Sequence, residues 1–197
     1  MKHAEAIELL STLVTPEMLT VTNLTTNARM WSALRGDRPS FYGLNMGLCL
    51  PFAVGLALAF PKRQVVAIDG DGSLIIETSA LITAAEANPP NLLAVVFDNG
   101  KYSDMAETAT SRRTDLERMA QGAGIQRTAT VHTAEDFSST VQEALAGDAL
   151  TFLVAKVESQ RDNPFRGRGD YIVRSERGMK EAFVETVRRL PDYGHWR

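Results

Sequence analysis

Gln64-Val65-Val66-Ala67-Ile68-Asp69-Gly70-Asp71-Gly72-Ser73 joins an apolar, β-branched run to a turn rich in glycine and aspartate. A second apolar run, at 91–97, also ends in a polar turn, Asp98-Asn99-Gly100. Runs that are apolar at almost every position are typical of parallel strands covered on both faces. We therefore predict two central strands of a parallel sheet, each followed by a turn at its carboxyl end.

The rest of the chain alternates strand-like and helix-like segments. Short β-branched or apolar runs predict strands, and apolar residues at three-to-four spacing predict helices. The strands are expected at 19–22, 64–68, 91–97, 128–131 and 151–157, and the helices at 1–13, 27–34, 47–59, 73–87, 115–122, 134–146 and 179–190. This alternation predicts an α/β fold, a doubly wound parallel sheet with helices on both faces. We expect a single domain over 1–197, with 159–197 as a C-terminal extension.

The composition limits the classes of partner. The 197 residues are 44% hydrophobic and carry a formal net charge of -3, which gives no electrostatic case for nucleic acid. The single cysteine, Cys49, excludes a disulfide framework and a multi-cysteine metal site. The most apolar segment, 46–60, is too short to span a bilayer, and 1–13 is an amphipathic helix unlike a signal peptide. We expect a cytoplasmic protein that binds neither nucleic acid nor membrane.

The two predicted strand ends carry residues suited to a metal–diphosphate group. Gly70 and Gly72 allow the backbone around Asp71 to turn sharply and to approach a ligand closely. Ser73 opens the next predicted helix, whose first N–H groups favour an anion. A divalent cation such as Mg²⁺ prefers oxygen ligands, and a carboxylate at Asp71 with a side-chain amide at Asn99 would supply two.

Each turn alone is also explained by ordinary turn chemistry. Asp-Gly and Asn-Gly pairs are frequent turn formers. The pair of turns, each closing an apolar strand with a helix between them, favours a binding site. A nucleotide-binding module is a weaker alternative, because the chain has neither a Gly-x-Gly-x-x-Gly motif nor a phosphate-loop lysine.

The same residues resemble a known cofactor motif. Gly70-Asp71-Gly72-Ser73, with 26 residues between Gly72 and Asn99, is similar to the thiamine diphosphate motif of Gly-Asp-Gly and a later Asn. The resemblance extends through 41–61 and 114–125 and covers about 20–158. The chain thus resembles the diphosphate-binding domain of thiamine diphosphate-dependent decarboxylases, most closely the β subunits of sulfopyruvate decarboxylases and of split phosphonopyruvate decarboxylases.

This resemblance implies thiamine diphosphate and Mg²⁺ as cofactors and assigns the metal and diphosphate contacts. The implied metal ligands are Asp71, the Asn99 side chain and the Lys101 backbone carbonyl. The implied diphosphate cradle consists of Gly70, Gly72 and Ser73. We expect the turn to face solvent, so that Asp71→Ala would abolish metal-dependent binding with little effect on folding.

Further implied contacts are spread along the cofactor. Met46 matches the bulky residue that holds the cofactor in its bent shape, and its N–H matches a donor to the pyrimidine ring. The Leu44 carbonyl matches the acceptor for the 4′-amino group. Asn27 falls near a diphosphate contact of acetolactate synthases, and Tyr102 lies in a segment close to cofactor and substrate.

The catalytic glutamate of this family belongs to a pyrimidine-binding domain, for which this chain offers no second α/β region. The resemblance therefore implies a separate pyrimidine-domain subunit in a hetero-oligomer, α2β2 or larger. The implied activity is that of a lyase that decarboxylates 2-oxoacids once the partner is bound. An acetolactate-synthase-like carboligase subunit and a catalytically silent assembly subunit are the alternatives.

The two-subunit relatives act on small anionic 2-oxoacids with a sulfonate or phosphonate tail, which requires positive charge near the site. The candidate side chains for this charge are Lys101, Arg112 and Arg113, and also Arg161, Arg166 and Arg168. Solvated surface charges or contacts to the partner are the alternative interpretation, above all for 161–168.

Overall fold

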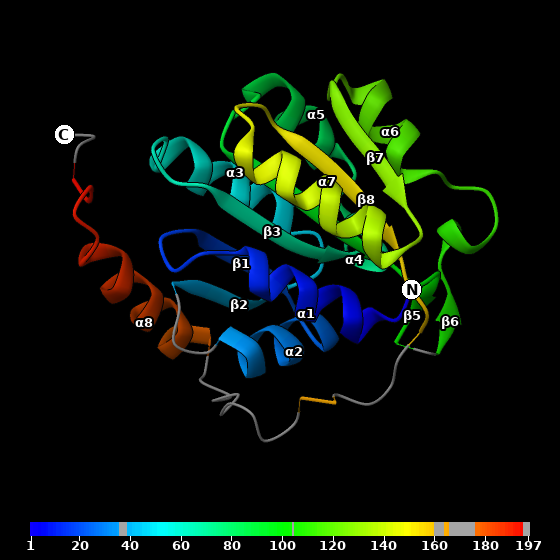
Figure 1. Cartoon of the computed structure of the whole chain (residues 1–197), viewed down its shortest axis with the longest axis horizontal. Helices are drawn as coiled ribbons and strands as arrows, with labels where there is room; N and C mark the ends of the chain where they lie inside the picture. Colours follow the sequence, from blue (N-terminus) through cyan, green and yellow to red (C-terminus); the bar gives the residue numbers. More distant parts are fainter. Residues whose placement is uncertain (36–38, 104, 160–163, 166–175, 195–197) are drawn as a thin grey trace.

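The computed structural model describes residues 1–35, 39–103, 105–159, 164–165 and 176–194. Its centre is a six-stranded parallel sheet in the order β2-β1-β3-β4-β8-β7 (Figure 1). The strands are β1 (Leu19–Asn23), β2 (Ser40–Leu44), β3 (Val65–Gly70), β4 (Leu92–Asp98), β7 (Arg127–Val131) and β8 (Thr151–Lys156). The predicted doubly wound α/β fold is confirmed.

Helices cover both faces of the sheet because the central strands are apolar on both sides. On β3, Val65 and Ala67 join one core cluster, whereas Val66 and Ile68 join the other. The first cluster includes side chains of α3 (Cys49–Ala59), α4 (Asp71–Ile76), α5 (Ser79–Ala87), α6 (Leu116–Ala123) and α8 (Glu176–Arg188). The second includes side chains of α1 (His3–Leu13), α2 (Thr26–Arg35) and α7 (Ala134–Ala146).

The direction of winding reverses between β1 and β3. The chain passes from β1 outward to β2, returns to β3 on the other side of β1, and continues to β4. In an open parallel sheet, such a reversal leaves a crevice at the carboxyl ends of the two central strands, where ligands bind. After β4 the chain forms a small antiparallel hairpin, β5 (Lys101–Tyr102) and β6 (Ala106–Glu107), and a short 3-10 helix, η1 (Ala109–Ser111).

One helix and one strand of the main sheet differ from the predictions made from sequence. The expected continuous helix at 73–87 is wrong: α4 ends at Ile76 and α5 starts at Ser79. The break brings Glu77 against the turn before α3, where a Cβ added to Gly47 would lie 2.8 Å from the Glu77 Cβ. Edge strand β2 was not predicted, because its five residues include Gly43 at φ 74° and lack a continuous apolar run.

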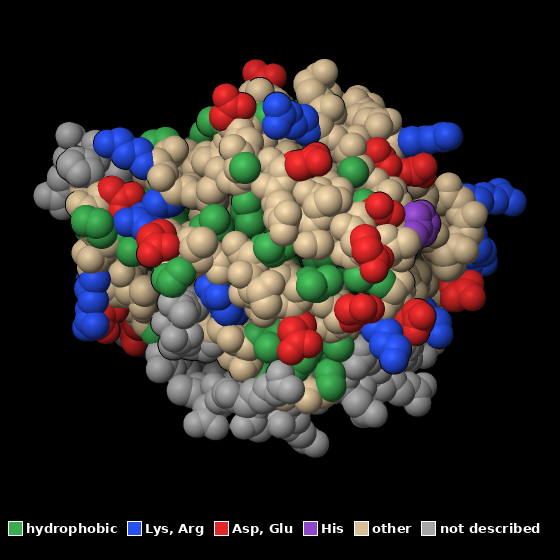
Figure 2. All heavy atoms as spheres, viewed as in Figure 1, with side chains coloured by type: hydrophobic (Ala, Val, Ile, Leu, Met, Phe, Trp, Pro, Cys, Tyr) green, Lys and Arg blue, Asp and Glu red, His purple; other side chains and the backbone are tan. Residues whose placement is uncertain are grey.

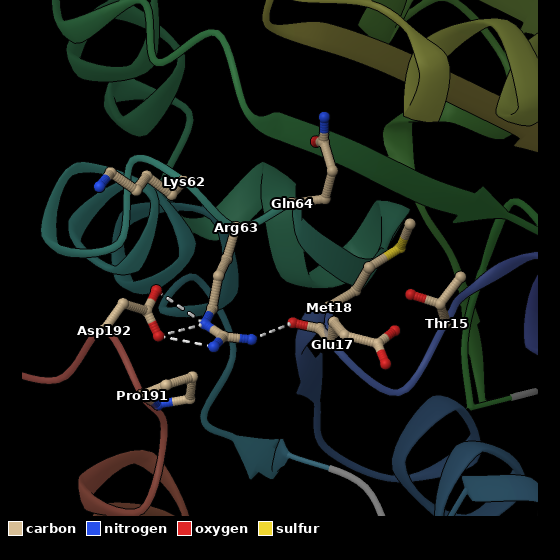
Figure 3. Close-up of a pocket in the computed structure, with 8 residues that line it drawn as sticks. All are labelled: Thr15, Glu17, Met18, Lys62, Arg63, Gln64, Pro191 and Asp192. Atoms are coloured by element: carbon tan, nitrogen blue, oxygen red, sulfur yellow. Dashed lines mark hydrogen bonds and ion pairs between the residues drawn. The ribbon is translucent and has the colours of Figure 1, made fainter.

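Helix α8 belongs to the predicted C-terminal extension and packs on the edge strand β2. The Phe183 ring meets Phe41 edge-on at 5.3 Å between ring centroids. Beyond the helix, Asp192 accepts hydrogen bonds from Arg63 Nε at 2.7 Å and Nη2 at 2.6 Å (Figure 3). The pocket drawn there, about 470 Å³, lies just before the amino ends of β1 and β3, at the opposite sheet edge from the predicted site. The sequence candidates Arg161, Arg166 and Arg168 lie outside the described residues.

Acidic and basic side chains lie scattered over the face shown in Figure 2. Among the described helices, none is both long and apolar enough to cross a membrane.

Candidate active site

The residues predicted to bind the cofactor line up along one edge of the sheet. They lie at or just after the carboxyl ends of four neighbouring strands: Leu44 on β2, Gly70 at the end of β3 and Asn99 directly after β4, with Asn23 ending β1 between them. The register pairs Asn23 with Leu44 and Gly70 with Phe97. The predicted diphosphate residues therefore lie at the sheet edge where the winding reverses between β1 and β3, the place where open parallel sheets bind ligands.

The turn between β3 and α4 has room only for glycine at its centre. A Cβ added to Gly72 would lie 2.6 Å from ring carbons of Tyr102, and one added to Gly70 would lie 3.3 Å from Asn23 Nδ2. Real Cβ atoms do not approach other heavy atoms within 3.0 Å, so the Gly72 position cannot accept a side chain without a shift of Tyr102. Glycine at position 72 thus makes room for the Tyr102 ring against the turn.

Asp71 is buried, with 2% of its surface exposed, so the expectation of a solvent-facing turn is wrong for this side chain. The cover comes from the segment after β4. Thr108 Oγ1 donates to Asp71 Oδ2 at 2.6 Å, and Thr110 Oγ1 lies 2.9 Å from the same oxygen. Burial raises the pKa of Asp71, and the hydrogen bond from Thr108 opposes this shift.

Thr110 also links the two turns. Its Oγ1 lies 2.8 Å from Asp98 Oδ1, so one hydroxyl stands between two carboxylates and its single proton can serve only one of them at a time. Asp98 is further paired with Lys156 at the end of β8. The sequence patterns did not indicate Thr108, Thr110 or Lys156. The 101–111 segment folds over the sheet edge and brings the two threonines to Asp71, whereas Lys156 meets Asp98 because β8 lies beside β4.

Asn99 and the following glycine form a turn held by side-chain oxygens. Asn99 Oδ1 accepts the Lys101 N–H at 2.9 Å, and Asp98 Oδ1 accepts the Gly100 N–H at 3.0 Å. Gly100 has φ 69°, a conformation that favours glycine. The Asn99 amide oxygen keeps a second lone pair for a cation.

The donor set fits a hard divalent cation held jointly with a diphosphate. Within the described part of the chain, no group of three or more His, Cys, Asp or Glu side chains could hold a metal by itself. A carboxylate, an amide oxygen and a main-chain carbonyl leave the remaining positions of an octahedron to diphosphate oxygens and water. The assignment of Asp71, Asn99 and the Lys101 carbonyl as ligands remains a prediction.

Asn27 has its polar atoms engaged within the protein. Its Nδ2 donates to Asn23 Oδ1 at 2.9 Å and to the Asp69 carbonyl at 3.0 Å, and its Oδ1 is 2.8 Å from His3 Nε2. Asn27 therefore supports Asn23, whose Nδ2 would lie 3.3 Å from a Cβ added to Gly70. A direct contact of Asn27 with the diphosphate stays a prediction. Asn23 was missed, although its position at the end of a β-branched strand marks the same sheet edge.

The remaining predicted contacts lie around the turn before α3. Ser73 Oγ accepts the Gly47 N–H at 3.1 Å, which ties the Met46–Gly47 turn to the β3–α4 turn. Met46 is half-buried, and Leu44 lines an apolar groove of about 540 Å³ shared with Phe52 and Phe183. The two residues predicted to contact the pyrimidine end of the cofactor thus lie shortly before α3, and one of them, Leu44, lines this groove.

Fold and site together define an α/β domain whose donor residues, at the reversal point of its sheet, suit a metal–diphosphate group. The family model described as "Thiamine pyrophosphate enzyme, C-terminal TPP binding domain" matches residues 25–155, and the chain belongs to this family. The family bears out the predicted cofactors, thiamine diphosphate with Mg²⁺.

Three similar proteins indicate which members of the family this chain resembles. The chain is 36% identical over 138 residues to the sulfopyruvate decarboxylase of Methanosarcina acetivorans, covering 68% of this chain but only 35% of that protein. It is 31% identical over 153 residues to sulfopyruvate decarboxylase subunit beta of Methanocaldococcus jannaschii, covering 76% and 78%. The solved thiamine diphosphate-dependent 4-hydroxybenzoylformate decarboxylase of Rhodococcus jostii superposes with a TM-score of 0.65 at 26% identity, covering 82% and 33%. The family and the Methanocaldococcus jannaschii relative, which is named as a beta subunit, bear out the predicted subunit of a thiamine diphosphate-dependent decarboxylase.

Proposed function

We propose that this chain is the diphosphate- and Mg²⁺-binding subunit of a two-subunit decarboxylase for small anionic 2-oxoacids, of the sulfopyruvate or phosphonopyruvate type. The observation that carries the proposal is the meeting of two turns at adjacent strand ends. Asp71 follows β3, Asn99 follows β4, and Thr110 bridges Asp71 to the residue before Asn99. A single metal–diphosphate group at this edge would be bound by residues of both turns.

Each end of the site has a distinct task. The metal ligands Asp71, Asn99 and the Lys101 carbonyl would fix the diphosphate, while Met46 would support the bent cofactor and the Leu44 carbonyl would accept its 4′-amino group. When bound, thiamine diphosphate supplies the carbon nucleophile and the electron sink that decarboxylation of a 2-oxoacid requires. The protein's residues contribute binding, orientation and exclusion of water.

The catalytic glutamate is assigned to a partner. Proton transfer at the pyrimidine requires a carboxylate within hydrogen-bond reach, and the proposed partner supplies it from its own pyrimidine-binding domain. The beta-subunit name of the Methanocaldococcus jannaschii relative supports a heteromer. We propose an α2β2 or larger assembly in the cytoplasm, inactive until both subunits are present.

Asp71→Asn tests the assignment, because it removes the carboxylate and keeps its shape. We expect Mg²⁺-dependent binding of thiamine diphosphate, measured by calorimetry on the complex with the partner subunit, to be lost. Asp115→Asn is the matched control, since Asp115 is an exposed cap of α6 that accepts the Arg118 N–H at 3.0 Å. Normal cofactor binding by Asp71→Asn would refute the site, and turnover by the isolated chain would refute the need for a partner.

A further inference from the structure

The hairpin after β4 reaches back over the turn that carries Asp71. The backbone of Thr108 is fixed at the base of this hairpin, where its N–H donates to the Gly100 carbonyl at 2.9 Å and its carbonyl accepts the Ser111 hydroxyl at 2.8 Å. Thr108 is 1% exposed, although it follows two exposed residues. A polar side chain in so buried a place needs a hydrogen-bond partner, and Asp71 is that partner.

Both threonine hydroxyls converge on one oxygen of Asp71. Thr108 donates to Oδ2 at 2.6 Å, Thr110 lies 2.9 Å from Oδ2, and the two hydroxyl oxygens are 2.7 Å apart. Among the described residues, no side chain donates a hydrogen bond to the other oxygen, Oδ1. The carboxylate is therefore oriented through Oδ2 by the two hydroxyls, and the backbone N–H of Gly72 also donates to this carboxylate. A carboxylate oxygen carries more than one lone pair, so Oδ1 can still face an ion.

We propose that Thr108 and Thr110 form a hydroxyl clasp, a pair of hydrogen-bonding side chains that positions Asp71 for the metal and so links the β5–β6 hairpin to metal binding. This proposal rests on the proposed function, because it concerns the same cation. Partners that hydrogen-bond to a metal ligand fix its orientation, and their loss typically lowers metal affinity by about 10–100-fold. The clasp thus makes the hairpin a contributor to cation affinity without direct contact to the cation.

The substitution Thr108→Val separates the hydroxyl from its packing. Valine keeps the branched shape, and the Thr108 methyl group approaches Gly72 closely, 3.4 Å from an added Cβ. We expect Thr108→Val to weaken binding of Mn²⁺ in the presence of thiamine diphosphate by about 10-fold or more, as measured by electron paramagnetic resonance on the complex. Thr108→Ser keeps the hydroxyl and should bind Mn²⁺ like the parent.

Hydrogen exchange supplies a readout that is independent of activity. In the parent and in Thr108→Ser, addition of Mn²⁺ with thiamine diphosphate should slow exchange of the amides in the hairpin, whereas Thr108→Val should show no such slowing. If Thr108→Val does not fold, Thr110→Val tests the same oxygen from a half-buried position. Its Mn²⁺ affinity should also fall.

The possible outcomes of these experiments test the hydroxyl clasp separately from the proposed function on which it rests. Parental Mn²⁺ affinity and parental exchange in the folded valine variants would overturn the clasp and leave the cofactor assignment standing. Loss of affinity in Thr108→Ser as large as in Thr108→Val would also overturn it, because packing would then explain the effect. A parent complex without cofactor-dependent Mn²⁺ binding would overturn the proposed function and the clasp together.

Discussion

The ring of Tyr102 lies directly against Gly72, so closely that a Cβ on the glycine would stand 2.6 Å from two ring carbons. This contact joins the hairpin after β4 to the turn after β3. Tyr102 is half-buried and its strand partner is Ala106, so the ring is held by the hairpin and by the turn together. The hairpin can therefore pack over the turn only because glycine, which has no side chain, occupies position 72.

Gly72→Ala should displace the hairpin from the turn. The added methyl group forces the Tyr102 ring outward, which loosens the cover over Asp71 while the sheet beneath stays intact. We expect faster hydrogen exchange at 101–108 and at least about 10-fold weaker binding of thiamine diphosphate with Mg²⁺. The thermal midpoint should change little.

Gly55→Ala is the matched control for this substitution. A Cβ at Gly55 meets nothing within 4 Å, and the residue lies inside α3. Alanine there should leave cofactor binding unchanged and raise stability by about 0.5–1 kcal/mol, because glycine is unfavourable within a helix. Unchanged exchange at 101–108 in Gly72→Ala would show that Tyr102 does not depend on the glycine.

His3 predicts a dependence of stability on pH. Burial lowers the pKa of His3 to about 4 from 6.5, against the opposing hydrogen bond with Asn27. Between these values the unfolded chain binds a proton that the native chain does not, so native stability rises with pH across this window. From about pH 5 to about pH 7 this group should add about 2 kcal/mol to the free energy of unfolding.

Urea unfolding of His3→Gln at the two pH values measures this contribution. Glutamine keeps an N–H donor for Asn27 and cannot titrate, so the rise in stability with pH should shrink by about 2 kcal/mol. His132→Gln, at an exposed position, serves as the control. An equal dependence on pH in His3→Gln and the parent would exclude His3 as its source.

The sheet and the two turns were predictable from sequence because each rests on local patterns. The runs at 64–68 and 91–97 are apolar on both faces, and glycine with aspartate or asparagine marks each strand end. That these two strands are neighbours in the sheet follows from the rules for connecting alternating strands and helices. The position of Asp71 and Asn99 at the ends of two neighbouring strands was therefore predictable, and their role as metal ligands stays a prediction.

The contacts that surround Asp71 were not predictable in the same way. Thr108 and Asp71 are 37 residues apart, and no periodic pattern connects them. Burial of Asp71 depends on a hairpin of two-residue strands, too short to leave a hydrophobic signature. The ion pair of Asp98 with Lys156 links strands β4 and β8, whose adjacency depends on the order of the whole sheet.

Arg63 and Asp192 should contribute to the docking of the C-terminal segment. Their side chains are 12% and 19% exposed and share several hydrogen bonds, a geometry that favours a measurable interaction. A double-mutant cycle with Arg63→Met and Asp192→Asn should give a coupling energy of about 1 kcal/mol in urea unfolding. The exposed pair Arg189–Glu185 should give about 0.3 kcal/mol as the control. Equal coupling energies in the two pairs would contradict the expectation that burial strengthens the Arg63–Asp192 interaction.

The last prediction concerns the tail of the substrate. Lys101, Arg112 and Arg113 are exposed on the segment that covers Asp71. Within the described part of the chain, the Arg112 guanidinium makes one ion pair, with Glu107 at 3.9 Å. Their charge is therefore available at the rim of the site, on the same segment as the metal turn. A sulfonate or phosphonate tail presents oxygens that such cations bind by charge-assisted hydrogen bonds.

Lys101→Met removes one of these charges and keeps the backbone carbonyl proposed as a metal ligand. With the partner subunit present, we expect kcat/KM for sulfopyruvate or phosphonopyruvate to fall by about 10–100-fold, since a hydrogen bond to a charged group contributes about 1.5–3 kcal/mol. Activity on pyruvate and benzoylformate should change little, as should every activity in Lys62→Met, whose exposed lysine lies at the opposite sheet edge. A parent complex that prefers pyruvate or benzoylformate would discard the anionic tail and leave the cofactor site untouched.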